Sequence, residues 1–503
     1  MPRRSSPKRV SLWPDLVISN AETSDAILRA TAAGQLKSLA RPFYTPAMDE
    51  NPATVIRRNV WKVVGALVPG AVISFRTALD ARPAEDGTVF LVSTGRYQRD
   101  LPGLRIRAVG GAGPQPSDAP FIAGLHLASR PRAMMEALTP SRARGTVSRG
   151  LTPTELEAWL EKDFQSGGES ALNRLRDAAR AMTERLNTAN EFAVLDRLIG
   201  QLLGTRSSAP TTPSAVARLA GRPYDVDRLS LFDTLFSALQ GYSGTRRLLS
   251  TTSNEVFATL SFFDAYFSNF IEGTEFEVEE ARAIVFNQVI PSVRPLDAHD
   301  VLGTFAVVGN RQTMQHCVRN DHNATAFAER LQILHARIME QRVDNRPGQF
   351  KTKHNRAGDT RFVSPDQVLG TLDYGYEMTR ALATPFQRAV AIMFILSEIH
   401  PFDDGNGRIA RAFMNAELVA ANEARMIIPT VYRDDYLTGL RTMSREGEPH
   451  PLIKVLDFAQ RWTAAIDWTS FARAEASMIL TNAFVRPSSE IALRLPVPRD
   501  RVN

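Results

Sequence analysis

The chain contains 503 residues, of which 44% are hydrophobic and 23% charged, and its formal net charge is +6. This length and hydrophobic content predict two to four packed domains and exclude a largely disordered protein. The 60 basic and 54 acidic residues nearly balance, as on an ordinary solvated surface, so charge alone selects neither nucleic acid nor an acidic partner.

Signals for membrane insertion, export or disulfide formation are absent from this sequence. No apolar run reaches the roughly 18 residues that a membrane-spanning helix needs. The basic residues 2–9 lead into Ser11, Leu12 and Trp13 rather than into an apolar signal core. The single cysteine, Cys317, excludes an intrachain disulfide and argues against a thiolate metal site. We therefore expect a cytoplasmic protein without a membrane partner.

The beginning of the chain predicts a small module that mixes helix and strand. Residues 1–14 are expected to form a disordered basic arm. A helical pattern near residues 26–29, a turn at Gly34 and an aromatic strand at residues 43–44 then follow in the order of a winged helix-turn-helix. Three segments typical of strands come next, at residues 71–75, 88–92 and 104–109.

Residues 15–135 resemble the antitoxin and transcriptional-regulator domains of the AbiEi type, in which a winged helix precedes a small α/β domain. The resemblance implies a DNA partner for this module. The expected recognition helix carries few basic side chains, however, and a module that packs against or binds another protein is the alternative.

From residue 150 onward the pattern becomes helical. Thr152-Pro153-Thr154-Glu155 has the form of a helix start, with a threonine cap and a proline in the first turn. Residues 150–213 are predicted to form a helical linker domain that ends in a Ser-, Thr- and Pro-rich break. We place the next domain at residues 214–470 and a C-terminal helix and tail at residues 471–503.

An amphipathic helix is predicted for residues 254–272, and Gly273 is a natural C-cap for it. Ser268 and Glu272 lie four residues apart and therefore share one face of that helix. Taken alone, such a pair is more often two exposed surface residues without a functional role. Further along, residues 350–363 have the pattern of two short strands joined by a polar turn, which predicts a β-hairpin.

A helix start at Thr384-Pro385-Phe386-Gln387 precedes the most informative stretch of the chain. Residues 389–396 are apolar on every face, as expected for a helix at the centre of a core. This helix should end near His400, because the residue before a proline is driven out of the helical conformation. A second helix is predicted from about Arg408 to Ala421.

Between these two helices the side chains required for phosphate chemistry are close together in sequence. Gly405-Asn406-Gly407 can turn successive backbone N–H groups toward one point, at the positive end of the following helix. Arg408 and Arg411 share a face and can hold different phosphates. Asp404 offers an oxygen to Mg²⁺, and His400 can accept a proton from a hydroxyl. The alternative is a loop that merely turns between helices.

The stretch His400–Arg411 resembles the signature of the Fic family, His-Pro-Phe-x-(Asp/Glu)-Gly-Asn-Gly-Arg-x-x-Arg, at every fixed position. The resemblance implies a mainly α-helical Fic fold with a small β-hairpin flap. It also implies transfer of AMP from ATP to a Ser, Thr or Tyr hydroxyl of a target protein. The roles implied are general base for His400, Mg²⁺ ligand for Asp404, anion hole for Gly405, Asn406 and Gly407, and phosphate clamps for Arg408 and Arg411.

Two further features resemble the family once this signature is present. Ser268, Glu272 and Gly273 match its inhibitory motif, (Ser/Thr)-x-x-x-Glu-(Gly/Asn). This match implies that Glu272 pairs with Arg411 in the space that the ATP γ-phosphate needs. The hairpin at residues 350–363 resembles the flap that holds the target segment by main-chain pairing. A homodimer is implied by the resemblance alone.

Two alternatives to AMP transfer remain open at this level. An enzyme with the same histidine and anion loop could transfer another phosphate-containing group, or remove AMP. A different class of protein, a toxin–antitoxin-like regulator, would act mainly through DNA binding by its N-terminal module.

Overall fold

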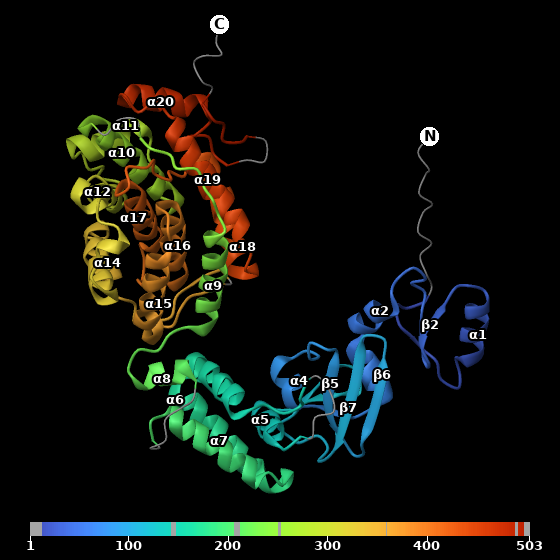
Figure 1. The fold of residues 1–503 in the computed structure, drawn as a ribbon. Helices are drawn as coiled ribbons and strands as arrows, with labels where there is room; N and C mark the ends of the chain where they lie inside the picture. Colours follow the sequence, from blue (N-terminus) through green and yellow to red (C-terminus); the bar gives the residue numbers. More distant parts are fainter. Residues whose placement is uncertain are drawn as a thin grey trace, which may run out of the picture. The chain divides into compact units, whose positions relative to one another are not determined.

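A computed structural model describes residues 13–141, 147–205, 212–249, 253–358, 360–487 and 491–496 (Figure 1). The chain divides into two compact units, residues 1–219 and 220–503. The predicted start of the second large domain, residue 214, lies six residues before this division. Most of the expected basic arm and the end of the expected tail lie outside the described residues. Among the described residues, no helix combines the length and apolar character needed to cross a bilayer.

The N-terminal unit begins with a small three-stranded sheet of order β1-β3-β2 and one helix, α1 (Ser24–Ala32). Its strands are β1 (Val17–Ile18), β2 (Lys37–Ala40) and β3 (Phe43–Thr45). The side chains of Ile27 and Leu36 are almost fully buried between helix and sheet. Within residues 15–46 the structure therefore has one helix, whereas the predicted helix-turn-helix requires two. The strand of the aromatic pair lies where it was predicted.

A six-stranded sheet of order β6-β7-β5-β4-β9-β8 forms the middle of this unit. Strands β5 and β7 pair in parallel, and the neighbouring pairs β4–β5 and β6–β7 are antiparallel. The three predicted strands correspond to β4, β5 and β7. The elements are α2 (Pro52–Arg58), α3 (Val60–Leu67), β4 (Val72–Ile73), α4 (Phe75–Asp80), β5 (Thr88–Ser93), β6 (Tyr97–Leu101), β7 (Leu104–Gly110), β8 (Ala119–Pro120), β9 (His126–Leu127) and α5 (Arg130–Leu138).

Helices α6 (Pro153–Leu186), α7 (Ala189–Leu202) and α8 (Pro213–Leu219) complete the unit. Helix α6 begins with the predicted cap, because Thr152 and Glu155 hydrogen-bond each other's backbone N–H groups. It bends at Gly168, whose φ of 65° is non-helical. These helices form one apolar core with the sheet helices α4 and α5.

The C-terminal unit is helical, with its centre formed by α16 (Pro385–Ile399) and α17 (Asn406–Val419) (Figure 1). Figure 1 shows α10, α12 and α14 on one side of this pair and α9, α18 and α19 on the other. The surrounding helices are α9 (Val226–Gln240), α10 (Asn254–Ile271), α11 (Val278–Asn287), α12 (Pro295–Val308), α13 (Arg311–Met314), α14 (Ala324–Ile338), α15 (Val368–Ala381), α18 (Arg433–Glu446), α19 (Pro449–Ala465) and α20 (Phe471–Leu480).

A small hairpin, β10 (Arg356–Ala357) and β11 (Thr360–Arg361), lies between α14 and α15 in the chain. The hairpin was predicted, although its strands are only two residues long. The fold class is confirmed: a mainly α-helical chain with a hairpin, preceded by a smaller α/β region.

Candidate active site

The candidate base is positioned by the end of α16. The helix starts with the predicted capping box of Thr384 and Gln387, and its apolar side chains are buried on every face. It ends at Ile399, and His400 takes a left-handed conformation with φ 51° and ψ 58°. A left-handed backbone is unfavourable for any residue with a Cβ. The surrounding structure must therefore hold His400 in place.

The ring of His400 is neutral and open to a proton on one side. Its Nδ1 lies 3.3 Å from the Ser397 carbonyl oxygen. A carbonyl can only accept, so Nδ1 carries the hydrogen and Nε2 is left as the proton acceptor. The ring stacks on Phe362 of the hairpin segment, with centroids 3.8 Å apart. Burial lowers the pKa of His400 to about 4.

The turn after His400 is closed by a side chain rather than by the backbone. Asn406 accepts from the Phe402 N–H at 2.9 Å and donates to the Phe402 carbonyl at 2.9 Å. Its amide therefore shapes the loop, and only its backbone N–H remains for an anion. Gly405, with φ 74°, caps α17, which begins at Asn406, two residues earlier than predicted. A Cβ at Gly407 would lie 2.1 Å from Glu272 Oε1, so any larger residue there would displace the Glu272 carboxylate.

A buried histidine supports the same loop from α14. His335 Nδ1 accepts from the Gly348 N–H at 3.0 Å, so its Nε2 donates to the Asp404 carbonyl at 2.9 Å. Its ring stacks on Phe402 with centroids 3.6 Å apart. Burial lowers the pKa of His335 to about 4. A ring held from both nitrogens is a structural support, and it does not face the cavity described below.

Arg411 contacts the end of α10 through three hydrogen bonds. Its Nε donates to Ser268 Oγ at 3.0 Å, and its Nη2 donates to the Ser268 carbonyl at 2.8 Å and to Glu272 Oε1 at 2.7 Å. Burial alone would raise the pKa of the Glu272 carboxyl, but the Arg411 charge and hydrogen bond hold it below its ordinary value. The side chain of Glu272 is 30% exposed, because it faces an open cavity. Gly273 follows with φ 91° and ends the helix.

Arg408 is placed differently from Arg411. Its Nη2 lies 3.3 Å from Asp300 Oδ2, and its Nη1 contacts the Met339 sulfur at 3.1 Å. Asp300 is shared with Arg342, whose Nη2 lies 2.7 Å away. Arg408 is buried and does not line the active-site cavity. In this conformation it supports the loop, and contact with a phosphate would require its guanidinium to leave Asp300.

Asp404 is exposed at the loop and offers a carboxylate to a cation. Its Oδ1 accepts from the Gly405 N–H at 2.7 Å, and its Oδ2 accepts from Asn345 Nδ2 at 3.0 Å. Nowhere in the described ranges do three His, Cys, Asp or Glu side chains form a group that could hold a metal ion. A single carboxylate fits Mg²⁺ that is bound largely by phosphates and water, not a protein-only cage.

Four of the candidate residues line one cavity of about 470 Å³, a volume within the range of small-ligand sites. His400, Gly407, Arg411 and Glu272 contribute to its wall, together with Phe362 of the hairpin segment. Helix α18 supplies the other side with side chains that the sequence did not single out, and these are Leu437, Leu440, Arg441, Ser444 and Arg445. The structure thus brings together the base, part of the anion loop and the predicted inhibitory residue.

Two residues missed by sequence analysis hold the turn of the base. Lys351 is only 3% exposed, and burial lowers its pKa to about 7. Lys351 and Asn355 together donate to four consecutive carbonyls of the turn. The acceptors are Ile399 (3.1 Å), His400 (3.3 Å), Pro401 (2.8 Å) and Phe402 (3.0 Å). A lysine and an asparagine four residues apart beside a turn give no sequence signal for this contact.

Helix α10 is anchored one turn before Ser268 by a buried polar network. Asp264 accepts two 3.0 Å contacts from Asn415 of α17 and one of 2.8 Å from Arg425. Asp264, Ser268 and Glu272 follow each other at intervals of four residues, so they form one stripe of α10. Removal of one partner from such a buried pair is strongly destabilising.

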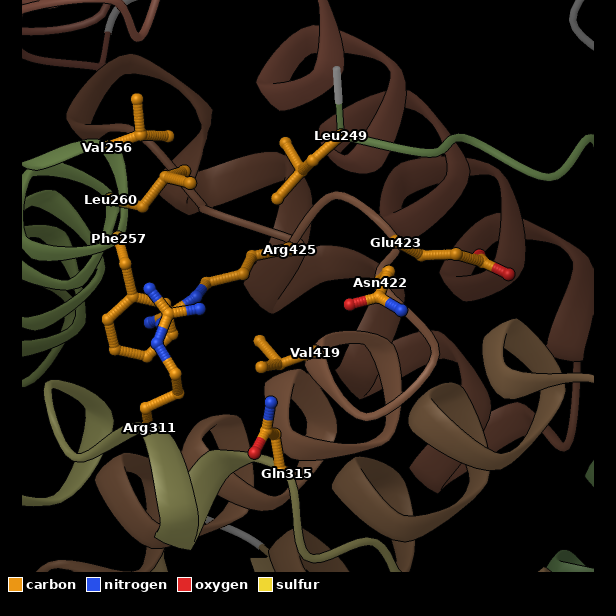
Figure 2. Close-up of a pocket in the computed structure, with 10 residues that line it drawn as sticks. All are labelled: Leu249, Val256, Phe257, Leu260, Arg311, Gln315, Val419, Asn422, Glu423 and Arg425. Atoms are coloured by element: carbon orange, nitrogen blue, oxygen red, sulfur yellow. The ribbon is translucent and has the colours of Figure 1, made fainter. Parts of the chain in front are cut away.

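Beside this network is a second, much smaller cavity of about 30 Å³ (Figure 2). Figure 2 shows the Arg425 side chain running toward Phe257 and Arg311, and both guanidinium groups lie within 5.0 Å of the Phe257 ring centre. A volume of this size holds about one water molecule. This cavity is therefore a small gap in the packing around Arg425 and not a ligand site.

Comparison with known proteins identifies the class of this domain. Residues 327–418 match the model of the Fic/DOC family. That segment contains His335, the hairpin, α16 and most of α17. The chain therefore carries a Fic domain.

Curated relatives match at modest identity. Protein adenylyltransferase fic-1 of Caenorhabditis elegans is 25% identical over 224 residues, 44% of this chain and 42% of that protein. Protein adenylyltransferase Fic of Aedes aegypti is 23% identical over 252 residues, 49% of each chain. The chain thus spans less than half the length of these relatives.

Solved structures of Fic proteins match this chain with low TM-scores. Fic-1 (residues 134–508) from C. elegans is 18% identical, covers 65% of this chain and 88% of its own, and gives a TM-score of 0.36. IbpAFic2 in complex with adenylylated Cdc42 is 16% identical, covers 62% of this chain and 94% of its own, and gives a TM-score of 0.31.

Proposed function

We propose that this protein is an adenylyltransferase that transfers AMP from ATP to a Ser, Thr or Tyr hydroxyl of a target protein. The observation that carries the proposal is the joint presence of neutral His400, Gly407 of the anion loop and Arg411 around one cavity. The names of the curated relatives support the same activity. A protein working on ATP and other proteins in this way is expected in the cytoplasm.

The proposed reaction balances with these residues. His400 Nε2 takes the proton of the target hydroxyl, and the hydroxyl oxygen attacks the α-phosphorus of ATP. The bond between the α-phosphorus and the bridging oxygen breaks, and pyrophosphate leaves. The backbone N–H groups of Asn406 and Gly407 and the positive end of α17 stabilise the charge that develops on the phosphate oxygens, whereas the Gly405 N–H donates to Asp404. Bound at Asp404, Mg²⁺ would neutralise charge on the ATP phosphates.

We further propose that Glu272 inhibits the enzyme in cis. Its carboxylate holds the Arg411 guanidinium at 2.7 Å and lies against Gly407. A phosphate that reaches Arg411 competes for the same donors, so Glu272 and a fully seated ATP exclude each other.

The identity of the transferred group is tested with two labels. Glu272→Gly protein is incubated with Mg²⁺ and either α-labelled or γ-labelled ATP, with and without a bacterial lysate. Label on protein from the α-position alone supports AMP transfer. Label from the γ-position, or from UTP or GTP in place of ATP, would instead support transfer of phosphate or another nucleotide. Loss of labelling with EDTA, and its return with Mg²⁺, tests the metal.

The proposed homodimer can be tested at an exposed apolar surface. Exposed apolar side chains gather after the inhibitory helix, namely Phe286 (45% exposed), Val289 (54%), Val293 (89%) and Leu296 (44%). We propose that this patch pairs with a second copy of the chain, because Phe286 stacks on Phe262 of α10 and so connects the patch to the inhibitory helix. A smaller particle for Val293→Asp by light scattering supports the homodimer.

DNA binding by residues 15–135 is the alternative function that concerns the N-terminal unit. Helix α1 carries one arginine in its last turn, Arg29, and an aspartate in its first. A gel shift that survives His400→Ala but disappears on removal of residues 1–135 would support this function.

The pH dependence of the reaction follows from His400. The base acts only when its imidazole is neutral, and its pKa is lowered to about 4 by burial. We therefore expect kcat/KM, which reports the free enzyme, to stay level from about pH 8 to about pH 5 and to fall only below that. An exposed histidine would give a fall near pH 6.5. A midpoint at that higher pH in the Glu272→Gly protein would contradict the assigned environment.

Lys351→Met tests whether the turn that contains His400 must be held by the Lys351 ammonium group. The variant keeps the volume but loses the donor to the Ile399 carbonyl and to Asn355. We expect kcat to fall by about 10- to 100-fold, because small displacements of a reacting group are costly. The affinity for ATP should remain unchanged, since Lys351 does not line the cavity. Initial rates and equilibrium binding measure the two effects separately. Equal kcat for both proteins would contradict the role.

A further inference from the structure

The β10–β11 hairpin places two arginines side by side. In its register Arg356 is directly opposite Arg361, and both side chains are exposed. Like charges at directly opposed positions of an antiparallel pair destabilise the pairing. The hairpin is only two residues long on each strand, so this repulsion acts on its single cross-strand pair of charges. An anion between the two guanidinium groups would relieve it.

A hollow of about 400 Å³ adjoins this pair. Its described lining consists of His354, Asn355, Arg356, Gly358 and Arg361. Gly358 also lines the cavity that contains His400. The basic hollow and the active-site cavity therefore share the tip of the hairpin as a common edge.

The positive charge continues around the edge of the active-site cavity. Arg441 and Arg445 are exposed on α18 and line that cavity opposite the anion loop. The two carboxylates that line the same cavity are already paired, Glu272 with Arg411 and Glu398 with Arg228. A polypeptide that reaches His400 across the hairpin thus meets four arginine side chains, Arg356 and Arg361 of the hairpin and Arg441 and Arg445 of α18.

We propose that the segment of the target protein that lies along this hairpin is acidic, with an Asp or Glu side chain entering the hollow between Arg356 and Arg361. Two guanidinium groups can bind a carboxylate by charge-assisted hydrogen bonds, and complementary charge also speeds docking. The inference rests on the proposed AMP transfer and adds the chemistry of its protein substrate. Arg356 and Arg361 do not line the active-site cavity, which favours a peptide carboxylate over a phosphate of ATP as their partner.

Three peptide pools test this substrate preference in the Glu272→Gly protein with α-labelled ATP. Every pool has Ser, Thr and Tyr acceptors at its centre, and the flanking positions are drawn from Asp and Glu, from Asn and Gln, or from Lys and Arg. We expect the acidic pool to be labelled at least about tenfold faster than the neutral pool, and the basic pool slowest. The difference should shrink in about 0.5 M salt, where exposed charges are screened.

Charge reversal provides the matched comparison. Arg356→Glu/Arg361→Glu should invert the order of the acidic and basic pools and leave the KM for ATP unchanged. Lys454→Glu/Arg461→Glu changes the net charge equally on α19, away from the hairpin and the described cavity lining, and should keep the original order. A changed KM for ATP in the hairpin variant would assign the arginines to the nucleotide and overturn the inference.

A binding measurement separates this inference from the proposed reaction. Fluorescein-labelled acidic peptide is titrated with Glu272→Gly protein in the absence of ATP and followed by anisotropy, so that no group can be transferred. Tighter binding of the acidic than of the neutral peptide, lost on reversal of Arg356 and Arg361, supports the inference whichever group is transferred. Equal binding of the peptides would overturn it, even if AMP transfer to protein is observed. Absence of label from α-labelled ATP would overturn only the proposed function.

Discussion

Glu272→Gly is expected to raise the initial rate of AMP transfer to protein by about 100-fold over the wild-type chain. The Glu272 carboxylate competes with phosphate for Arg411. It also lies next to Gly407 of the anion loop. A differential of about 2.7 kcal/mol between inhibited and open states corresponds to such a factor, and a single charge-assisted contact can supply it. The measurement is label transfer from α-labelled ATP at equal protein concentration.

The same change is expected to lower the melting temperature of the ATP-free protein. It leaves the buried Arg411 without its counter-ion, although the Ser268 contacts remain. ATP with Mg²⁺ should restore part of the lost stability, because a ligand that binds only the folded state raises the melting temperature of the protein. Glu279→Ala removes an exposed carboxylate of α11 and serves as the control, with no change expected in either quantity. Equal rates for Glu272→Gly and wild type would refute inhibition by Glu272.

His400→Ala, introduced into the Glu272→Gly protein, is expected to reduce transfer by about 10²- to 10⁴-fold, the usual contribution of a positioned general base. The loss should appear in kcat. Binding of ATP should be nearly unchanged, because the loop N–H groups and Arg411 remain. The stack on Phe362 is also lost, so the hairpin segment should become more mobile and the KM for a peptide should rise.

His322→Ala is the control for this variant, because His322 is exposed and outside the cavity lining. It should transfer label at the rate of the Glu272→Gly parent. Retention of full activity by His400→Ala would assign the base elsewhere. In that case Lys351, whose pKa burial lowers to about 7, would be the next titratable group to examine beside the turn.

Local sequence signals predicted several helix ends correctly, because contacts between residues close together in the chain decide where a helix begins and ends. The capping box of Thr384, the end of α16 before Pro401 and the end of α10 at Gly273 are set by contacts within a few residues. The N-terminal region shows the limit of such signals. Helix α1 and the strand at residues 43–45 are present, yet residues 15–46 contain no second helix, and α2 begins only at Pro52. Its presence depends on packing that local periodicity does not report.

The sequence by itself determined the Fic motif and the chemical types at the site: a base, an anion loop, two arginines and a carboxylate four residues from a serine. Only the tertiary structure decided which partners they contact and which of them line the cavity. Arg408 and Arg411 are equivalent in sequence, but Arg408 contacts Asp300, while Arg411 lines the cavity and contacts Glu272. The support from Lys351 and Asn355 likewise joins segments about 50 residues apart. Such contacts depend on which faces of distant helices meet, and burial then sets each pKa.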